Sequence, residues 1–350
     1  MTTRGRPAPS VKVPPRRLPC LRHRTRRPAR ARPSGNVWPV YRGLKVGVVV
    51  PAYKEENHVG RVVETMPELV DRVVVVDDAS PDGTARAARA AADHRTEVVT
   101  LERNQGVGGA IVAGHKRVIE LGADVSVVMA GDGQMDPAYL PALLDPIVED
   151  GYGFTKANRF YSFTSFEGMP RHRVFGNVVL TFLNKAASGY WNLVDPQNGY
   201  TACTAQALSL VPLDKLHKRY DFENDLLIWL NIADVRARDV NVPAVYGDER
   251  STMSLTKVAP RILATLIAGG WRRMWRKYVL WSFSPIALLA ICGLFLTVFG
   301  VVVGIATTVW SLTNGVSAST GTWLLGVASA LVGIQFLVQA LVLDIQATPK

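Results

Sequence analysis

Short apolar runs alternate with polar turns and helix-like segments from Lys45 to about residue 150. The runs VGVVV, RVVVV, EVVT and VSVVM are rich in valine, as buried parallel strands are. Segments with helical spacing follow these runs, at residues 59–69, 85–92 and 139–148 among others. Strands that alternate with helices at this spacing predict an α/β fold with a mostly parallel, Rossmann-like sheet, doubly wound and right-handed.

Two long uncharged segments lie near the C-terminus. Pro285–Trp310 and Gly321–Leu343 contain no charged residue over 26 and 23 residues. At about 1.5 Å per residue, a helix of either length exceeds the roughly 30 Å hydrocarbon core of a bilayer. The short neutral link between them predicts a two-helix transmembrane hairpin over residues 285–343. The alternative is a pair of core helices buried in a soluble protein.

A basic and aromatic stretch precedes the first of these segments. Its basic residues are interleaved with tryptophan and tyrosine: Arg272, Arg273, Arg276 and Lys277. Basic residues favour the cytosolic side of a membrane, and aromatic residues favour its interface. We therefore expect a juxtamembrane amphipathic helix over residues 257–284. The domain before it and both termini are then expected in the cytosol, with the protein integral to the cell membrane.

The positive charge of the chain is concentrated at its N-terminus. The 350 residues contain 40 Lys and Arg against 29 Asp and Glu, a formal charge of +11. Residues 1–45 hold thirteen of these basic residues and no acid, so the remainder is close to neutral. Residues 1–44 are rich in Pro and Arg without an apolar period, which predicts a disordered tail. Solvation, adhesion to an anionic lipid surface and nucleic-acid binding are the alternatives for this tail.

The run VSVVM leads into a loop, residues 130–137, that is rich in oxygen ligands. Asp132, Gln134 and Asp136 stand at alternate positions in it. Two carboxylates and one amide oxygen suit Mg²⁺ or Mn²⁺, which usually share their coordination with substrate phosphates. The loop therefore predicts a metal site at these three residues. The alternative is a surface turn in which the two acids are only solvated and capping.

Polar residues also follow the other three strands. They are Tyr53, Glu55, Asp77, Asp78, Arg103 and Asn104. In an open sheet, ligands bind beyond the carboxyl ends of the parallel strands, so we expect these side chains in one crevice. Asp77 or Asp78 can accept a hydrogen bond from a ring N–H of a nucleotide base. Gly106 lies in the turn NQGVGG and lets the backbone approach a ligand. The GxGxxG spacing is absent, which disfavours an oxidoreductase.

The chain after residue 151 is less regular, but it supplies charges that could complete a site. They are Arg159, Arg171, Arg173, Asp195, Glu223, Asp225 and Arg250. Glu223 is either a general base towards a hydroxyl group or a carboxylate favoured by the positive end of a helix. Asp195 precedes a proline and either belongs to the site or holds a turn.

Five motifs, in their order along the chain, resemble those of the family 2 glycosyltransferases with a GT-A fold. The motifs are PAYKEEN, VVVDDASPDGT, NQGVGGAIVAG, AGDGQMDP and VDPQNGYTA. With the C-terminal apolar segments, they are most similar to the polyprenyl-phosphate glycosyltransferases, the dolichyl-phosphate-mannose-synthase-like group. The resemblance implies a GT-A domain over residues 45–256, ahead of the juxtamembrane helix and the hairpin.

The resemblance also implies roles for individual residues. Asp132 matches the last Asp of the family's DxD motif and Gln134 matches a frequent metal ligand, whereas Ala130 stands where the motif has its first Asp. Nucleotide-sugar contacts are expected at Pro51, Tyr53, Glu55, Asp77, Asp78, Arg103, Asn104, Gly106 and Asp132. Contacts to donor or acceptor phosphates are expected at Arg159, Arg250 and Ser254.

The implied reaction is inverting transfer of a sugar from a UDP- or GDP-linked donor to a polyprenyl phosphate, with Mg²⁺ or Mn²⁺ as cofactor. Because the acceptor is already anionic, positioning and charge stabilisation by Asp132, Arg159 and Arg250 are expected to carry catalysis. One alternative is a saccharide or glycolipid hydroxyl acceptor with Glu223 as base. Another is a non-catalytic nucleotide-sugar-binding membrane protein, which Ala130 keeps open. A homo-oligomer is also left open, and no nucleic-acid partner is expected.

Overall fold

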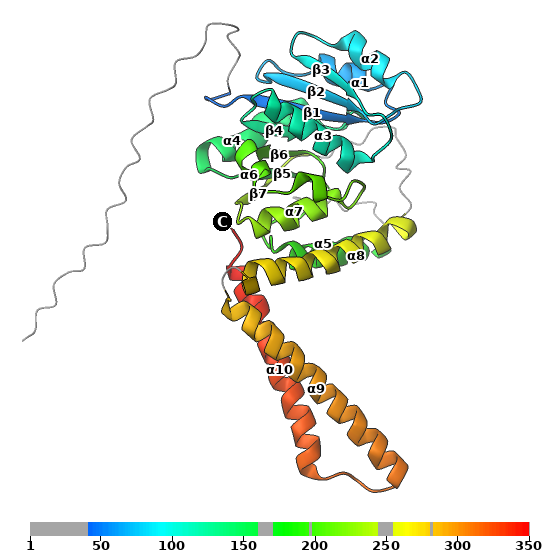
Figure 1. Ribbon diagram of the computed structural model, residues 1–350, viewed down its shortest axis with the longest axis vertical. Coiled ribbons are helices and arrows are strands. Elements are labelled where there is room, and N and C mark those ends of the chain that lie inside the picture. Colours follow the sequence, from blue (N-terminus) through cyan, green and yellow to red (C-terminus); the bar gives the residue numbers. More distant parts are fainter. Residues whose placement is uncertain (1–40, 160–170, 196–197, 244–254, 281–282, 350) are drawn as a thin grey trace, which may run out of the picture. The chain divides into compact units, whose positions relative to one another are not determined.

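The computed structural model describes residues 41–159, 171–195, 198–243, 255–280 and 283–349. Within them lies a seven-stranded sheet with the strand order β3-β2-β1-β4-β6-β5-β7 (Figure 1). The strands are β1 (Val46–Ala52), β2 (Arg72–Asp77), β3 (Thr96–Thr100), β4 (Val125–Val128), β5 (Phe154–Asn158), β6 (Thr201–Thr204) and β7 (Ala237–Asn241). β6 is antiparallel to both neighbours, and all other pairs are parallel. The predicted mostly parallel α/β fold is confirmed, with one antiparallel strand that the valine pattern did not predict.

The central place of β1 among the parallel strands determines where the chain leaves the sheet. Ala52, the last residue of β1, pairs with Asp77, the last residue of β2. Backbone bonds continue this pairing beyond the strands, because Asp78 N–H donates to Ala52 O (2.9 Å) and Gly131 N–H donates to Pro51 O (3.1 Å). The carboxyl ends of β1, β2 and β4 therefore lie side by side at one edge of the sheet.

Helices cover both faces of the sheet and bury its valine side chains. They are α1 (Val59–Glu64), α2 (Thr84–Ala91), α3 (Val107–Glu120), α4 (Leu140–Asp150), α5 (Arg171–Ser188), α6 (Ala205–Ser209) and α7 (Phe222–Ile232), with short helical turns η1 (Pro137–Tyr139) and η3 (Leu213–Lys215). Helices α1, α2 and α4 share a buried cluster with β1, whereas α3 packs on the opposite face against Val49, Val74 and Val76. The interior is thus largely aliphatic, and the polar side chains expected in the site follow the ends of the strands.

The first predicted helix is shorter than expected. The segment 59–69 forms a helix only as far as Glu64, the end of α1. Pro67 explains the difference, because proline lacks the N–H that would bond to the preceding turn and disfavours helical geometry in the residue before it. The helices expected over 85–92 and 139–148 correspond to α2 and to η1 followed by α4.

The predicted juxtamembrane segment, residues 257–284, is helical as far as Leu280. It forms α8 (Leu255–Arg273), which continues as a π-helical turn, η4 (Met274–Leu280). α8 packs on α5 and α7, where it buries Ile262 and Leu266. Its other face leaves Ile267 and Trp271 exposed, at 65% and 67%. The helix is therefore apolar on two sides, one against the domain and one uncovered. The expected bounds of the tail, domain and helix stay predictions, because residues 1–40 and 244–254 lie outside the described part of the chain.

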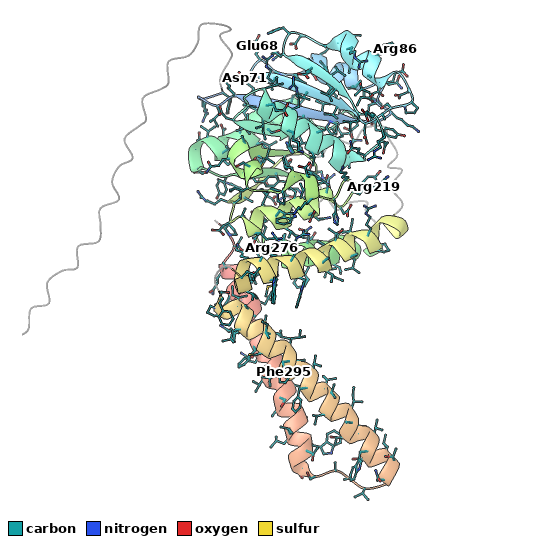
Figure 2. The ribbon with its side chains drawn as sticks, in the orientation of Figure 1. Glu68, Asp71, Arg86, Arg219, Arg276 and Phe295 are labelled. Carbon is teal, nitrogen blue, oxygen red and sulfur yellow. The ribbon has the colours of Figure 1, made fainter. Side chains whose placement is uncertain are left out.

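Two long helices, α9 (Pro285–Asn314) and α10 (Thr320–Gln346), form a hairpin (Figure 1). Both are long and apolar enough to cross a membrane, with mean hydropathies of 2.8 and 2.0 over their most apolar stretches. Many of their large apolar side chains are exposed, as is Phe295 in Figure 2. Core helices of a soluble protein would bury such side chains, so the two helices fit a membrane hairpin.

Small residues spaced by seven hold the hairpin together. The buried positions of α9 include Gly293, Gly300 and Thr307, and those of α10 include Gly326 and Gly333. A Cβ atom at Gly300 would lie only 2.5 Å from the carbonyl oxygen of Gly326. In lipid there is no hydrophobic driving force between apolar helices, because the lipid tails are as apolar as the side chains. Close backbone packing of this kind is therefore what holds such helices together.

Replacing Gly300 by alanine should separate α9 from α10, because the new methyl group meets backbone that cannot move aside. We expect Gly300→Ala to cost about 1–3 kcal/mol, as overpacked cores do, and to lower the midpoint of thermal unfolding in detergent. Gly304→Ala is the matched control, since a Cβ atom at Gly304 meets nothing within 4 Å. Equal unfolding midpoints for the two variants would contradict the close packing of α9 against α10 at Gly300.

Candidate functional site

The turns that follow β1 and β2 are hydrogen-bonded to each other. Glu55 N–H donates to Thr84 Oγ1 (2.8 Å), and Lys54 N–H donates to Ser80 Oγ (3.2 Å). Lys54 and Ala79 both adopt left-handed backbone conformations, with φ of +63° and +56°, which residues other than glycine rarely do. Such strained residues persist where their surroundings hold them, often at ligand sites. The two turns, residues 53–55 and 78–84, therefore form one surface along the edge of the sheet, which we call the wall.

The sequence-predicted residues of this wall differ in exposure. Tyr53 is 44% exposed, so its ring is open to a ligand. Pro51 is buried in β1, and Glu55 is partly buried. Asp77 is buried and accepts a hydrogen bond from Ser80 N–H (3.2 Å), so this carboxylate stabilises the turn after β2.

Asp78 connects this wall to the glycine-rich turn before α3. Its side chain is buried, and its two carboxylate oxygens accept hydrogen bonds from Gln105 N–H (2.7 Å) and Gly106 N–H (2.8 Å). Asn104 Nδ2 donates in turn to the backbone carbonyl of Asp78 (3.2 Å). An ionised acceptor makes such bonds roughly twice as strong as neutral ones. Asp78 therefore fixes the backbone of the Asn104–Gly106 turn, a role that the sequence did not predict.

The glycines of that turn accommodate the chain itself. Gly106 has a φ of +88°, and a Cβ atom there would lie 2.5 Å from the carbonyl oxygen of Lys218. A Cβ atom at Gly108 would lie 2.6 Å from Cβ of Phe222. The sequence predicted that glycine would let a ligand approach the backbone. That stays a prediction; the structure shows that the glycines also let the segment before α7 pack directly on this turn.

The loop after β4 carries the predicted metal ligands. Asp132 Oδ1 accepts a hydrogen bond from Gln134 N–H (3.0 Å), and the residue between them, Gly133, has a φ of +73°. Asp136 Oδ1 accepts from Ala138 N–H (2.8 Å) and so caps η1. Each acid thus uses one oxygen to shape the loop, as the surface-turn alternative expected.

This loop fits a divalent cation that is only partly coordinated by protein. In the described residues, the second carboxylate oxygens of Asp132 and Asp136 accept no hydrogen bond, and no three His, Cys, Asp or Glu side chains converge as a cation cage. Mg²⁺ is usually held by one or two carboxylates with substrate phosphates and water. Two acids and the Gln134 amide match that pattern, and Ala130 removes a third acid from it.

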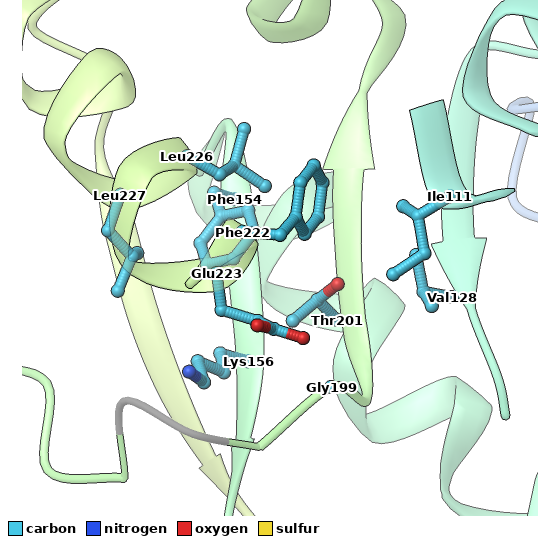
Figure 3. Close-up of a pocket in the computed structure, with 10 residues that line it drawn as sticks. All are labelled: Ile111, Val128, Phe154, Lys156, Gly199, Thr201, Phe222, Glu223, Leu226 and Leu227. Atoms are coloured by element: carbon cyan, nitrogen blue, oxygen red, sulfur yellow. The ribbon is translucent and has the colours of Figure 1, made fainter. Parts of the chain in front are cut away.

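Glu223, at the start of α7, lies near the loop after β4. A Cβ atom at Gly199 would lie 3.5 Å from Met135 Cε of that loop and 4.0 Å from Glu223 Oε1. Glu223 also lines a small cavity with Lys156 and Thr201 (Figure 3). Burial raises the pKa of Glu223 to about 6, and the nearby ammonium of Lys156 opposes the rise. A carboxylate with a pKa of about 6 can exchange a proton near neutral pH.

Arg159 forms a two-pronged ion pair with a buried acid. Its Nε and Nη2 atoms donate to Asp195 Oδ2 (2.8 Å) and Oδ1 (3.2 Å), and the Asp195 side chain is only 1% exposed. Lys156 is buried near Asp195 and Glu223, and burial lowers the pKa of Lys156 against the attraction of these acids. Asp195 therefore orients a guanidinium that is still 38% exposed at the end of β5.

The remaining predicted residues divide into those described and those outside the description. Arg103 is exposed next to the Asn104 turn, whereas Arg250 and Ser254 lie in a segment, residues 244–254, that the structure does not describe. Sequence reasoning missed Lys156. A lysine inside the strand FTKAN, between buried neighbours, was the available signal, because an unpaired lysine is almost never buried.

Replacing Asp78 by asparagine should loosen the Asn104–Gly106 turn, because the amide has one acceptor oxygen for two N–H groups that bind separate carboxylate oxygens. We expect faster hydrogen exchange at Gln105 and Gly106, because one of the two N–H groups loses its acceptor. Glu97→Gln, on the surface beside Arg117, is the control and should leave hydrogen exchange at Gln105 and Gly106 unchanged. Unaltered hydrogen exchange at Gln105 in Asp78→Asn would contradict the role of Asp78 in fixing this turn.

Comparisons with known proteins agree with this architecture. Residues 47–214 match the model of glycosyl transferase family 2. The undecaprenyl-phosphate mannosyltransferase of Micrococcus luteus is 32% identical over 58% of this chain and 84% of its own length. The UDP-N-acetylglucosamine–dolichyl-phosphate N-acetylglucosaminyltransferase of Methanococcus voltae is 28% identical over 57% of this chain and 86% of its own.

A solved structure supports the fold. Glucosyl-3-phosphoglycerate synthase from Mycobacterium tuberculosis, crystallised with Mn²⁺, UDP-glucose and phosphoglyceric acid, superposes with a TM-score of 0.51. It is 22% identical, and the match covers 65% of this chain and 80% of that one. The family expected from the five motifs is confirmed, and the non-catalytic alternative is disfavoured. The chain belongs to glycosyl transferase family 2 and is a glycosyltransferase.

Proposed function

We propose that this chain transfers a sugar, with inversion at its C1 atom, from a nucleoside diphosphate sugar to a polyprenyl phosphate. The observation that carries the proposal is the shared sheet edge at which the turns after β1, β2 and β4 hold Tyr53, Asp78 and Asp132. The relatives from M. luteus and M. voltae support the acceptor, because both are named for transfer to a polyprenyl phosphate. The UDP-glucose and Mn²⁺ of the M. tuberculosis neighbour agree with the donor and the cofactor.

The donor would occupy the wall and the loop after β4. We assign its base and ribose to the exposed ring of Tyr53 and to the turn that Asp78 clamps, and its diphosphate to the loop of Asp132. Asp132, Gln134 and Asp136 would hold Mg²⁺ or Mn²⁺, which when bound neutralises charge on the diphosphate. We assign Arg159, which Asp195 orients, to phosphate oxygens of the donor or the acceptor.

The reaction needs little proton transfer. An anionic oxygen of the acceptor phosphate attacks C1 of the sugar and forms the new C–O bond. The bond between C1 and the donor's β-phosphate oxygen breaks, and its electron pair leaves with the nucleoside diphosphate. Attack from the side opposite the leaving group inverts C1. Positioning and charge stabilisation are then the main contributions of the protein.

The C-terminal part would keep the enzyme beside its lipid acceptor. We assign α9 and α10 to the bilayer and the uncovered apolar face of α8, with Ile267 and Trp271, to its interface. The catalytic domain and the termini would lie on the cytosolic side, where sugar nucleotides are available.

Replacing Asp132 by asparagine should remove an anionic ligand from the diphosphate site. We expect at least a hundredfold loss of transfer from a labelled sugar nucleotide to polyprenyl phosphate with Mn²⁺ or Mg²⁺, the scale on which fixed charges stabilise transition states. The product is a lipid whose label is released by mild acid. Asp124→Asn is the control, because Asp124 precedes the other end of β4. Near-normal transfer by Asp132→Asn would contradict the assignment.

A second candidate, transfer to a sugar hydroxyl, is favoured by the raised pKa of Glu223. A base with a pKa of about 6 is protonated below pH 6, so hydroxyl transfer would slow there and recover above it. Since polyprenyl phosphate needs no such base, we expect Glu223→Gln to retain most transfer to it at pH 7.5. If the transfer rate of Glu223→Gln still falls below pH 6, the fall reflects protonation of another group, such as the acceptor phosphate. Loss of all transfer in Glu223→Gln, together with a wild-type protein that labels only hydroxyl acceptors, would favour the second candidate.

A further inference from the structure

A buried acid at the end of α10 connects three parts of the chain. Asp344 is 5% exposed, and its carboxylate accepts four hydrogen bonds. Arg273, at the end of α8, donates from Nη1 to Oδ1 (2.7 Å) and from Nη2 to Oδ2 (3.0 Å). Tyr278 of η4 donates from its hydroxyl to Oδ1 (2.6 Å), and Trp191 of the catalytic domain donates from Nε1 to Oδ2 (3.0 Å). We call Asp344, Arg273, Tyr278 and Trp191 the junction.

Arg273 also binds the catalytic domain directly. Its Nε donates to the carbonyl of Ala187 (3.0 Å) and its Nη2 to that of Ala186 (3.0 Å), both in α5. The guanidinium, 2% exposed, is therefore satisfied by α5 and α10 together. Gly189 makes room for it, with a φ of +75° and with a Cβ position only 2.4 Å from Arg273 Nη1. In Figure 1 the red end of α10 meets the end of α8 beside α5.

Neighbouring basic residues are also engaged by the domain. Arg272 forms an ion pair with the buried Asp225, and Lys277 Nζ lies 3.2 Å from Asp234 Oδ1. Arg276, labelled at this level in Figure 2, lies over the ring of Trp229 at 4.9 Å. The sequence used these charges to place this side of the membrane in the cytosol, and in the structure they also connect α8 and η4 to α7 and the loop after it. These contacts do not involve α10, whereas the junction does.

Burial of the junction indicates a role in geometry. A buried ion pair contributes little net stability compared with apolar packing, but it is costly to break from one side, and in some proteins it selects one arrangement of elements. Here the selected arrangement is that of the hairpin against the catalytic domain. The phosphate of a lipid acceptor is held at the membrane surface, so this arrangement determines how the donor site meets it.

We propose that Asp344 is a positioning residue for transfer to a membrane-embedded acceptor. The junction holds the catalytic domain in one orientation on the hairpin, and the acceptor phosphate then meets the sugar C1 atom in line. Donor binding, which we assign to the turns after β1, β2 and β4, involves none of the four junction residues and should not depend on them. This inference rests on the proposed function for its catalytic consequence, although the junction can be tested apart from it.

The kinetic test compares two acceptors with the full chain in lipid nanodiscs. For Asp344→Asn, we expect kcat/KM for long-chain polyprenyl phosphate to fall about tenfold, because misplacement of reacting groups by roughly 1 Å costs this much or more. The KM for the sugar nucleotide and the rate with a short, water-soluble prenyl phosphate should not change. Asp234→Asn, which removes an exposed partner of Lys277, is the matched control. Equal losses with both acceptors, or no loss with either, would overturn the proposal.

A distance measurement tests the junction without any reaction. Spin labels at Ala90→Cys on α2 and Ser317→Cys in the loop between α9 and α10, with Cys20 and Cys292 replaced by serine, report domain orientation; Cys203 is buried. We expect a narrow distance distribution, and a broad one with Asp344→Asn. An unchanged width would show that the junction does not hold the domain in one orientation. A wild-type protein that leaves polyprenyl phosphate unmodified would refute the proposed function, but the distance measurement would still test the junction.

Discussion

The parallel pairing of β1 with β2 on one side and β4 on the other is the constraint on which the rest of the structure depends. Parallel strands leave a sheet at the same edge, so three turns that are far apart in the sequence become neighbours. The pairing of Ala52 with Asp77, and the backbone bond from Gly131 to Pro51, extend this neighbourhood beyond the strands themselves. The strands β1, β2 and β4 can then be largely aliphatic, while polar side chains gather where they end.

The acids at that edge serve structure and chemistry together. Asp78 holds the Asn104–Gly106 turn with both oxygens, and Asp132 shapes its own loop with one. Carboxylates that are fixed by backbone N–H groups need little rearrangement when a ligand arrives, which is the condition for electrostatic stabilisation in a site. Arg159 is oriented in the same way by the buried Asp195. The acids and the guanidinium at this edge are therefore held in place by contacts within the protein.

Patterns local in sequence predicted much of this molecule. Valine runs predicted the parallel strands, and uncharged length predicted the two apolar helices. The polar residues after the strands were expected at one edge because topology alone brings them there. Contacts between distant segments could not be predicted in this way. The antiparallel course of β6, the packing of Lys218 on Gly106 and the burial of Arg273 against Asp344 all depend on tertiary packing. The basic run before α9 was interpreted from composition, which cannot distinguish a lipid headgroup from Asp225 or Asp344 as its partner.

The central claim is that the turns after β1, β2 and β4 form one site for a nucleoside diphosphate sugar. Hydrogen exchange of the full chain in nanodiscs, with and without UDP or GDP and Mn²⁺, tests it most directly. The account predicts slower exchange at residues 53–55, 78–80, 104–106 and 131–134 together, with a single dependence on nucleotide concentration. Protection confined to one of these turns, or found only elsewhere in the chain, would contradict it.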